Sequence, residues 1–405
     1  MLRKTALPFL LFYMFLAMLG IGLVIPILPG LLIDFGAGGK AAGYLVSAFG
    51  LTQFLFSPIA GNISDKYGRK PMIVVGLCLF VLSNLLAATA DHFSLFLVSR
   101  LVGGMGAAAL IPSIMAYVVD ITTEEQRPRA MSFLGASMSS GFIVGPGLGG
   151  LLAEFGTRTP FFASASIGFL AVLSCIPLLT ESKTSEERLM HLKSKPKKDN
   201  IFRQLVQSVK SRYFILLLLI FALSFGLTHF EAIYPLFVTQ SYGFTTREIS
   251  ILFMVCSFIG TFNQLVLTNR LTQRFGEKPI ISSMLLLSGV SLVSLLFSGN
   301  FFYVMVITML YFTFNNILRP TINTLLSREA GNEQGFVAGL NNAYMSLGQI
   351  FGPVLAGFLF DIHINLPYLF GAFVLLVSSF VSVRWIGNKK GIIAKENRGV
   401  EDRAL

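Results

Sequence analysis

Long apolar blocks alternate with short polar segments along nearly the whole chain. Each block holds about twenty residues or more, the length that a helix needs to cross the hydrocarbon core of a bilayer. The longest polar stretch, 181–212, follows the sixth block and predicts a linker between two sets of six spans. The pattern predicts twelve membrane-spanning helices, near residues 7–29, 41–60, 72–90, 93–119, 131–153, 159–179, 213–239, 247–268, 280–298, 301–326, 336–359 and 366–387.

The second half of the chain repeats the first. Residues 141–150 return as residues 348–357, and residues 66–71 return as residues 274–279, at shifts of 207 and 208 residues. A long repeat in an apolar chain is typical of transporters built from two helical bundles, which bind their substrate where the repeats meet. We therefore expect an all-α membrane protein of two pseudo-symmetric six-helix bundles. Its predicted parts are an N-terminal bundle (1–180), a basic cytoplasmic linker (181–212), a C-terminal bundle (213–387) and a cytoplasmic tail (388–405).

Composition and charge agree with a membrane protein. Hydrophobic residues make up 54% of the chain and charged residues 13%, about half the charged share of a soluble domain. The net charge of +11 lies between the apolar blocks, beside lipid headgroups, so we set binding of nucleic acid aside. The basic segments lie on the side of the linker and of both termini, which the positive-inside rule assigns to the cytoplasm.

Glu231 is the one acidic residue well within a predicted span. A buried carboxylate is costly unless it is paired, hydrated or protonated, and burial favours its neutral form. Glu231 can therefore take up and release a proton, and it offers a cationic compound a fixed negative charge. We predict that proton and cation compete for this carboxylate. The alternative is a structural carboxylate that is hydrogen-bonded to a neighbouring helix.

Two arginines also lie within predicted spans. Arg100, in the outer part of the fourth span, either faces the cavity or extends to the outer interface, and the sequence leaves both placements open. Arg319 precedes a proline in the tenth span, which also carries Asn315 and Asn316. Buried charges of this kind are expected to have a function, because the bilayer disfavours them.

A short charged loop joins the second and third predicted spans. Arg69 can reach a carboxylate, for which Asp120 at the inner end of the fourth span is a candidate. Asp65 can accept hydrogen bonds from free amides at a helix N-terminus. We predict that these three residues form a latch on the inner face; the alternative is a solvated basic loop. The repeat has Gln273 and Glu277 in place of Asp65 and Arg69, so we expect a weaker latch there.

Glycine recurs at every fourth residue in the fifth predicted span, at Gly141, Gly145 and Gly149. This spacing makes a smooth stripe on one helix face, which lets a neighbouring backbone come close. Pro146 removes a helix hydrogen bond and permits a bend, and Gly150 ends the segment. A packing role and a transport role need the same residues here, and we expect packing to be most of it.

Several of these segments together resemble the major facilitator superfamily. The loop at 61–71 resembles the superfamily's signature between spans two and three, and residues 141–150 look like the antiporter motif of its drug:proton antiporters. The glycines and prolines at 20–29 and the segment 100–106 are similar to first-span and fourth-span patterns of the same twelve-span branch. The resemblance covers nearly the whole chain, and it points to the NorA-like multidrug efflux pumps.

The resemblance implies the major facilitator fold and the export of drugs in exchange for protons. It also ties Arg100 to proton handling, so the predicted proton-coupling residues are Glu231, Arg100 and Arg319. NorA-like pumps often carry an aspartate where this chain has Asn316, so one of two acidic groups is missing here. The predicted cavity residues, in spans that face the cavity in this fold, are Gln53, Met138, Phe230, Tyr234, Asn315, Asn316, Asn341, Asn342 and Tyr344.

The sequence thus predicts a secondary active transporter, not an enzyme, that exports amphipathic cationic or zwitterionic compounds by alternating access. It has no glycine-rich nucleotide-binding loop, histidine cluster or metal-ligand spacing, so we expect no cofactor and no metal. Export of a sugar, a metabolite or a glycolipid stays an alternative. We expect a bacterial cell-membrane protein that functions as a monomer, with its substrate, protons and lipid as partners.

Overall fold

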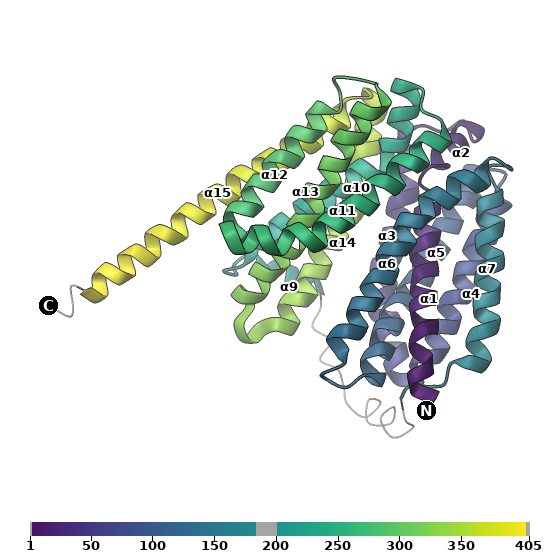
Figure 1. The fold of residues 1–405 in the computed structure, drawn as a ribbon, viewed down its shortest axis with the longest axis horizontal. Helices are drawn as coiled ribbons and strands as arrows, with labels where there is room; N and C mark the ends of the chain where they lie inside the picture. Colours follow the sequence, from purple (N-terminus) through teal and green to yellow (C-terminus); the bar gives the residue numbers. More distant parts are fainter. Residues whose placement is uncertain (1, 184–200, 402–405) are drawn as a thin grey trace. The chain divides into compact units, whose positions relative to one another are not determined.

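The computed structural model describes residues 2–183 and 201–401, and all regular elements in these ranges are helices (Figure 1). This agrees with the predicted all-α membrane fold. Parts of the predicted linker, 184–200, and of the predicted tail, 402–405, lie outside the described residues. The first range contains α1 (Leu2–Leu23), α2 (Leu28–Asp34), α3 (Gly39–Tyr67), α4 (Arg69–Ala88), α5 (Phe93–Ile121), α6 (Arg127–Ala153) and α7 (Thr159–Leu178).

The second range begins with a short helix that ends the predicted linker, and six long helices follow it. The last of these helices continues past the end of the predicted span at residue 387. The elements are α9 (Ile201–Ser208), α10 (Phe214–Tyr242), α11 (Thr246–Phe275), α12 (Glu277–Ser294), α13 (Phe301–Ala330), the 3₁₀ turn η1 (Gly331–Glu333), α14 (Gln334–Ile362) and α15 (Leu366–Glu401).

Eleven helices in the described part of the chain are long and apolar enough to cross a membrane. They correspond to eleven of the twelve predicted spans. The remaining prediction, 280–298, corresponds to α12, which is 18 residues long and begins with Glu277 and Lys278. Its charged first turn and its five serines lower the mean hydropathy of this helix.

The first predicted span, 7–29, is wrong as a single helix. Residues 24–27 form turns that separate α1 from α2. Pro26 explains the break, because its nitrogen carries no hydrogen and its ring disfavours helical backbone at Ile25. Pro29 lies in the first turn of α2, where a backbone N–H would have no partner within the helix.

Two glycines that are related by the repeat make the turns from α3 to α4 and from α11 to α12. Gly68 has a φ of +115° and Gly276 a φ of +78°. Residues with a side chain rarely adopt such values, which glycine adopts without strain. A single residue therefore separates the two helices at each turn, and the start of the second helix lies close to the last turn of the first.

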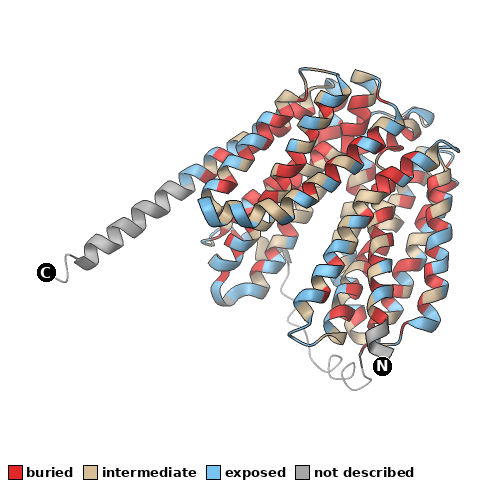
Figure 2. Ribbon diagram, viewed as in Figure 1, coloured by how far each residue is buried: buried red, intermediate tan, exposed pale blue. Residues whose placement is uncertain are grey.

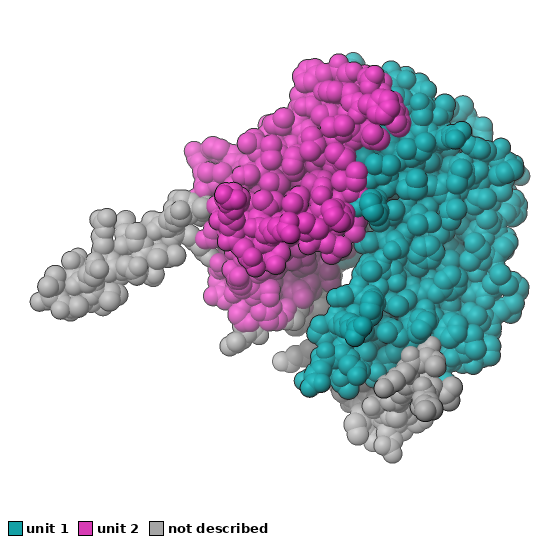
Figure 3. Space-filling model, viewed as in Figure 1, with its two compact units in different colours: residues 1–198, 231–258, 349–364 teal, residues 199–230, 259–348, 365–405 magenta. Residues whose placement is uncertain are grey.

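Contacts divide the chain into two compact units that do not coincide with the sequence halves (Figure 3). The boundaries fall within α10, α11 and α14, so each of these helices belongs partly to both units. The division into bundles at 1–180 and 213–387 stays a prediction. Unit 1 comprises Met1–Lys198, Glu231–Phe258 and Gln349–Ile364, and unit 2 comprises Asp199–Phe230, Ile259–Gly348 and Asn365–Leu405.

Buried and exposed positions both occur along the long helices, as expected for helices that contact protein on one side and lipid on the other (Figure 2). In unit 1, the largest core cluster joins α1, α4, α5, α6 and α7. Tyr13 and Tyr117 are fully buried in this cluster. Tyr13 also shares a hydrogen bond of 3.0 Å with the Ser174 hydroxyl, which satisfies its buried polar end.

The glycine stripe of α6 packs against α1 within unit 1. A Cβ atom at Gly141 would lie 2.4 Å from the carbonyl oxygen of Phe15, and a Cβ atom at Gly149 would lie 2.4 Å from that of Leu23. The two backbones are therefore in direct contact over this stretch, as the stripe predicts. A transport role for the same residues stays a prediction.

Replacing Gly141 with valine is expected to lower the thermal stability of the protein. The new side chain overlaps the α1 backbone, and overpacking of this kind costs about 1–3 kcal/mol. Gly135→Val is the matched control in the same helix, because a Cβ atom at Gly135 meets no atom within 4 Å. Melting curves in detergent measure both variants. Equal melting temperatures for the two would show that the α1–α6 contact is not tight.

Candidate functional site

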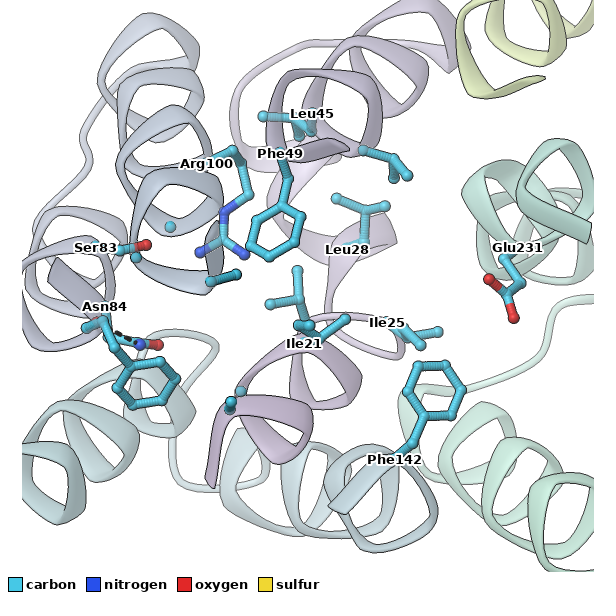
Figure 4. Close-up of a pocket in the computed structure, with 18 of the residues that line it drawn as sticks. Ile21, Ile25, Leu28, Leu45, Phe49, Ser83, Asn84, Arg100, Phe142 and Glu231 are labelled. Carbon is cyan, nitrogen blue, oxygen red and sulfur yellow. Dashed lines mark hydrogen bonds between the residues drawn. The ribbon is translucent and has the colours of Figure 1, made fainter. Parts of the chain in front are cut away.

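A cavity of about 150 Å³ lies within unit 1, and it is lined mainly by apolar side chains of α1 and α3 to α5 (Figure 4). Two charged residues line it as well, Arg100 and Glu231. They are two of the three predicted proton-coupling residues. The complete lining comprises Ala17, Gly20, Ile21, Val24, Ile25, Leu28, Leu45, Val46, Phe49, Phe80, Ser83, Asn84, Arg100, Gly103, Gly106, Ala107, Leu110, Phe142, Glu231 and Ala232.

Arg100 of α5 lies at the cavity, one of the two placements that the sequence left open. Its Nε donates a hydrogen bond of 3.4 Å to the Ser99 hydroxyl. Its guanidinium carbon lies 5.2 Å from the centre of the Phe96 ring and 5.9 Å from that of Phe161. Ring faces attract cations at these distances. The two rings thus help to hold the guanidinium group in place.

Glu231 of α10 lies across the cavity from Arg100. In Figure 4 the apolar side chains of Phe49, Leu28 and Ile25 lie between the two charged groups. The Glu231 side chain is neither fully buried nor exposed. Separate positive and negative charges in an apolar cavity can each bind a group of opposite charge on one ligand.

The neighbouring histidine, His229, takes no part in this cavity. It is buried, its Nε2 lies 2.8 Å from the carbonyl oxygen of Pro367, and its ring stacks on Phe225. A residue two positions from Glu231 points to a different side of the helix. The contacts of His229 with Phe225 and Pro367 agree with this difference in direction.

The other predicted cavity residues are not among the residues that line this cavity. Phe230 packs on Tyr311, with ring centres 4.6 Å apart, and Tyr234 packs on Phe253 at 5.6 Å. The Tyr344 hydroxyl shares a hydrogen bond of 2.8 Å with Ser208 at the end of the linker. Met138 packs against the core cluster of unit 1. Their roles, and those of Gln53, Asn341 and Asn342, stay predictions.

Arg319 and the asparagines of α13 belong to unit 2. Arg319 is exposed, and its Nη2 contacts the sulfur of Met345 at 3.0 Å. Asn315 is buried and donates to the carbonyl oxygen of Tyr311 at 2.9 Å. Asn316 lies against Gly260 of α11. None of the three is among the residues that line the cavity of unit 1.

The predicted latch residues come together as an inner charge cluster, consisting of Asp65, Arg69 and Asp120. Arg69 Nη2 lies 2.7 Å from Asp65 Oδ1, and Arg69 Nε lies 3.2 Å from Asp120 Oδ2. The Arg69 side chain is only 9% exposed. The cluster ties the end of α3 to α4 and α5, because one buried cation holds two carboxylates.

The first residues of the predicted linker complete the inner charge cluster, which sequence reasoning missed. Lys183 Nζ lies 2.9 Å from Asp65 Oδ1, and the Ser182 hydroxyl donates to Asp120 Oδ2 at 2.8 Å. The Glu181 carboxylate accepts hydrogen bonds from the free amides of Arg69 at 2.8 Å and Lys70 at 3.2 Å. A carboxylate at a helix N-terminus is stabilising. The sequence signal was a charged run directly after the sixth span.

The second half contains a corresponding ion pair with the charges exchanged. Glu277 and Arg328 lie 208 residues after Arg69 and Asp120, and Glu277 Oε1 lies 2.7 Å from Arg328 Nη1. The Arg328 side chain is 66% exposed, whereas that of Arg69 is 9% exposed. Solvent weakens exposed ion pairs. This exposure agrees with the weaker latch that we expected in the second half. The sequence analysis did not identify Arg328 as the partner of Glu277.

Sequence reasoning also missed Asp361, at the end of α14. Its carboxylate accepts from the backbone nitrogens of Gly39 at 2.8 Å and Lys40 at 3.3 Å, so it caps the N-terminus of α3. Nearby, the Ser47 hydroxyl donates to the carbonyl oxygen of Ile350 at 2.7 Å. These contacts, all within unit 1, join α3 to α14. Only their spatial proximity identifies Asp361.

Comparison with known proteins agrees with this architecture. The sequence pattern of the Major Facilitator Superfamily matches residues 10–269 and 216–401. The chain is 40% identical over 393 residues to multidrug resistance protein 2 of Bacillus subtilis (strain 168), covering 97% of this chain and 98% of that protein. It is 36% identical over 359 residues to quinolone resistance protein NorA of Staphylococcus aureus (strain COL), covering 88% and 90%.

A solved structure gives the same result for the fold. The crystal structure of a bacterial homolog to the human lysosomal transporter Spinster matches with a TM-score of 0.75 at 14% sequence identity, over 95% of each chain. At that identity the likeness concerns the fold alone. Two family matches that together span residues 10–401 and full-length relatives at 36–40% identity carry the assignment. The chain is a multi-pass membrane protein that belongs to the Major Facilitator Superfamily.

Proposed function

We propose that this protein exports amphipathic cationic or zwitterionic drugs from a bacterial cell in exchange for protons. The observation that carries the proposal is Glu231, a carboxylate within a membrane span that lines a mainly apolar cavity. Relatives over nearly the whole chain are named for resistance to multiple drugs or to quinolones. An apolar wall with one carboxylate suits amphipathic cations, because the wall takes the apolar body and the carboxylate the charge.

Proton and cation use Glu231 in turn. In a state open to the cytoplasm, the ionised carboxylate binds a cationic group, and the loaded carrier then opens to the outside. A proton from outside joins the carboxylate and releases the cation. The protonated carrier returns and gives its proton to the cytoplasm. Arg100 and Arg319 keep their predicted part in proton coupling, and Asn316 leaves Glu231 without a second acid at that position.

The proton gradient supplies the energy, so the cycle needs no cofactor. Both termini lie in the cytoplasm, according to the distribution of basic residues. The presence of both sequence halves in a single chain supports a carrier that functions as a monomer. The inner charge cluster stabilises one state of the carrier, since its two carboxylates and Arg69 separate only at a cost.

Transport by purified protein that is reconstituted in lipid vesicles tests the proposal, with the cytoplasmic face of the assayed carriers outward. An imposed pH gradient is expected to drive accumulation of a fluorescent lipophilic cation, and a proton ionophore is expected to stop it. The same assay with zwitterions and sugars separates drug export from export of a sugar or another metabolite. Accumulation of sugars alone, or accumulation that is independent of the pH gradient, would contradict the proposal.

A further inference from the structure

In the part of the chain that the structure describes, few partners engage the guanidinium group of Arg100. An arginine side chain carries five N–H donors. Among the residues that the structure describes, one long hydrogen bond of 3.4 Å, from Nε to the Ser99 hydroxyl, engages this group, and no ion pair to a carboxylate joins it. A charge in an apolar cavity is costly without a partner. Arg100 therefore has both the capacity and the energetic reason to bind an anion.

The polar neighbours of Arg100 in the cavity, Ser83 and Asn84, are uncharged, and both donate hydrogen bonds to helix backbone. The Ser83 hydroxyl donates to the carbonyl oxygen of Ser99 at 2.7 Å. The Asn84 side-chain nitrogen donates to the carbonyl oxygen of Phe80 at 2.8 Å (Figure 4). Neither residue neutralises the guanidinium group. An anionic group that enters this end of the cavity thus meets the Arg100 guanidinium group, which the Phe96 and Phe161 rings contact.

We infer that Arg100 binds a carboxylate of the transported compound, while Glu231 binds its ammonium group. The inference rests on the proposed function and adds a residue that selects among its substrates: Arg100 favours those zwitterions whose two charges are separated by an apolar body. The guanidinium fork matches a carboxylate with two parallel hydrogen bonds. The apolar body lies against side chains such as Phe49, Leu28 and Ile25, which line the cavity between the two charges.

Binding of a zwitterion and its methyl ester to the purified full-length protein tests this inference. Esterification removes the carboxylate charge and leaves the amine and the apolar body unchanged. We expect wild-type protein to bind the zwitterion more tightly than the ester. Loss of one charge-assisted contact lowers affinity by about tenfold or more. Arg100→Gln should therefore lower the affinity for the zwitterion by that factor, and the affinity for the ester by less than about threefold.

Two further variants separate recognition of the carboxylate from a general effect on the cavity. Arg100→Lys keeps the positive charge but not the planar fork, so a reduced preference for the zwitterion is expected to remain. Phe49→Leu alters the apolar wall and should lower the affinity for both ligands by the same factor. Size-exclusion profiles and melting curves check that each variant is folded, and the wild-type comparison of the two ligands needs no variant at all.

Equal affinity of wild-type protein for zwitterion and ester would overturn the inference. If Arg100→Gln lowers the affinity for both ligands by the same factor, the inference is also overturned. Arg100 would then maintain the shape of the cavity rather than bind a carboxylate. The proposed function fails separately. If the zwitterion binds through Arg100 but no pH gradient drives its transport in vesicles, the binding subsite stands and proton-coupled export does not.

Discussion

Glu231→Gln is expected to reduce proton-driven efflux of a lipophilic cation to the background of protein-free vesicles. Glutamine has nearly the same shape as glutamic acid, but it cannot carry the proton that the exchange requires. It also removes the negative charge that attracts the cation, and loss of one charged contact costs about 1.5–3 kcal/mol. Transport by inverted vesicles with an imposed pH gradient measures the first effect, and equilibrium binding of the cation measures the second.

The matched control for this experiment is Glu125→Gln, which removes a carboxylate from the exposed turn between α5 and α6. It should transport at the wild-type rate, because it lies outside the cavity and outside the inner charge cluster. A Glu231→Gln protein that still exchanges cations for protons would remove Glu231 from the mechanism. The cavity itself would remain, since its walls do not depend on that charge.

Arg69→Gln is expected to destabilise the protein and to slow transport, and by more than Arg328→Gln does. Arg69 is 9% exposed and holds Asp65 and Asp120, whereas Arg328 is 66% exposed and holds Glu277. Loss of hydrogen bonds to charged groups in a buried site costs about 1.5–3 kcal/mol, and loss of an exposed ion pair costs about 0–1 kcal/mol. Melting curves and initial efflux rates in vesicles compare the two variants.

The repeat supplies a rescue for the same experiment. Arg69→Glu alone places three carboxylates together, so it should be more damaging than Arg69→Gln. The triple variant Asp65→Gln, Arg69→Glu, Asp120→Arg copies the residues that the second half has at the related positions. We expect it to recover part of the lost stability, because Glu277 and Arg328 pair at 2.7 Å in that arrangement. Stability of the triple variant below that of Arg69→Glu would contradict an exchangeable ion pair.

The sequence predicted the candidate site unevenly. Asp65, Arg69 and Asp120 could be predicted because a basic residue on a short turn needs a carboxylate, and the fourth span ends with one. Lys183 and Asp361 could not, since each meets its partner only after helices far apart in the chain pack together. The Glu277–Arg328 pair was hidden for another reason. When the repeats are compared one position at a time, Glu277 in place of Arg69 indicates a lost ion pair. The pair is found only when Arg328 in place of Asp120 is considered as well.

The sequence by itself determined the class of this protein: the length of the apolar blocks, the repeat and the distribution of basic residues follow from the cost of placing backbone and charges in a bilayer. It also singled out Glu231, since an acid within a span is rare. Only the tertiary structure decided that Arg100 shares a cavity with Glu231, and that Phe230 and Tyr234 pack elsewhere. Residues of similar polarity occur on every face of these helices. The side of a helix that meets a cavity depends on how whole helices pack, which no local pattern specifies.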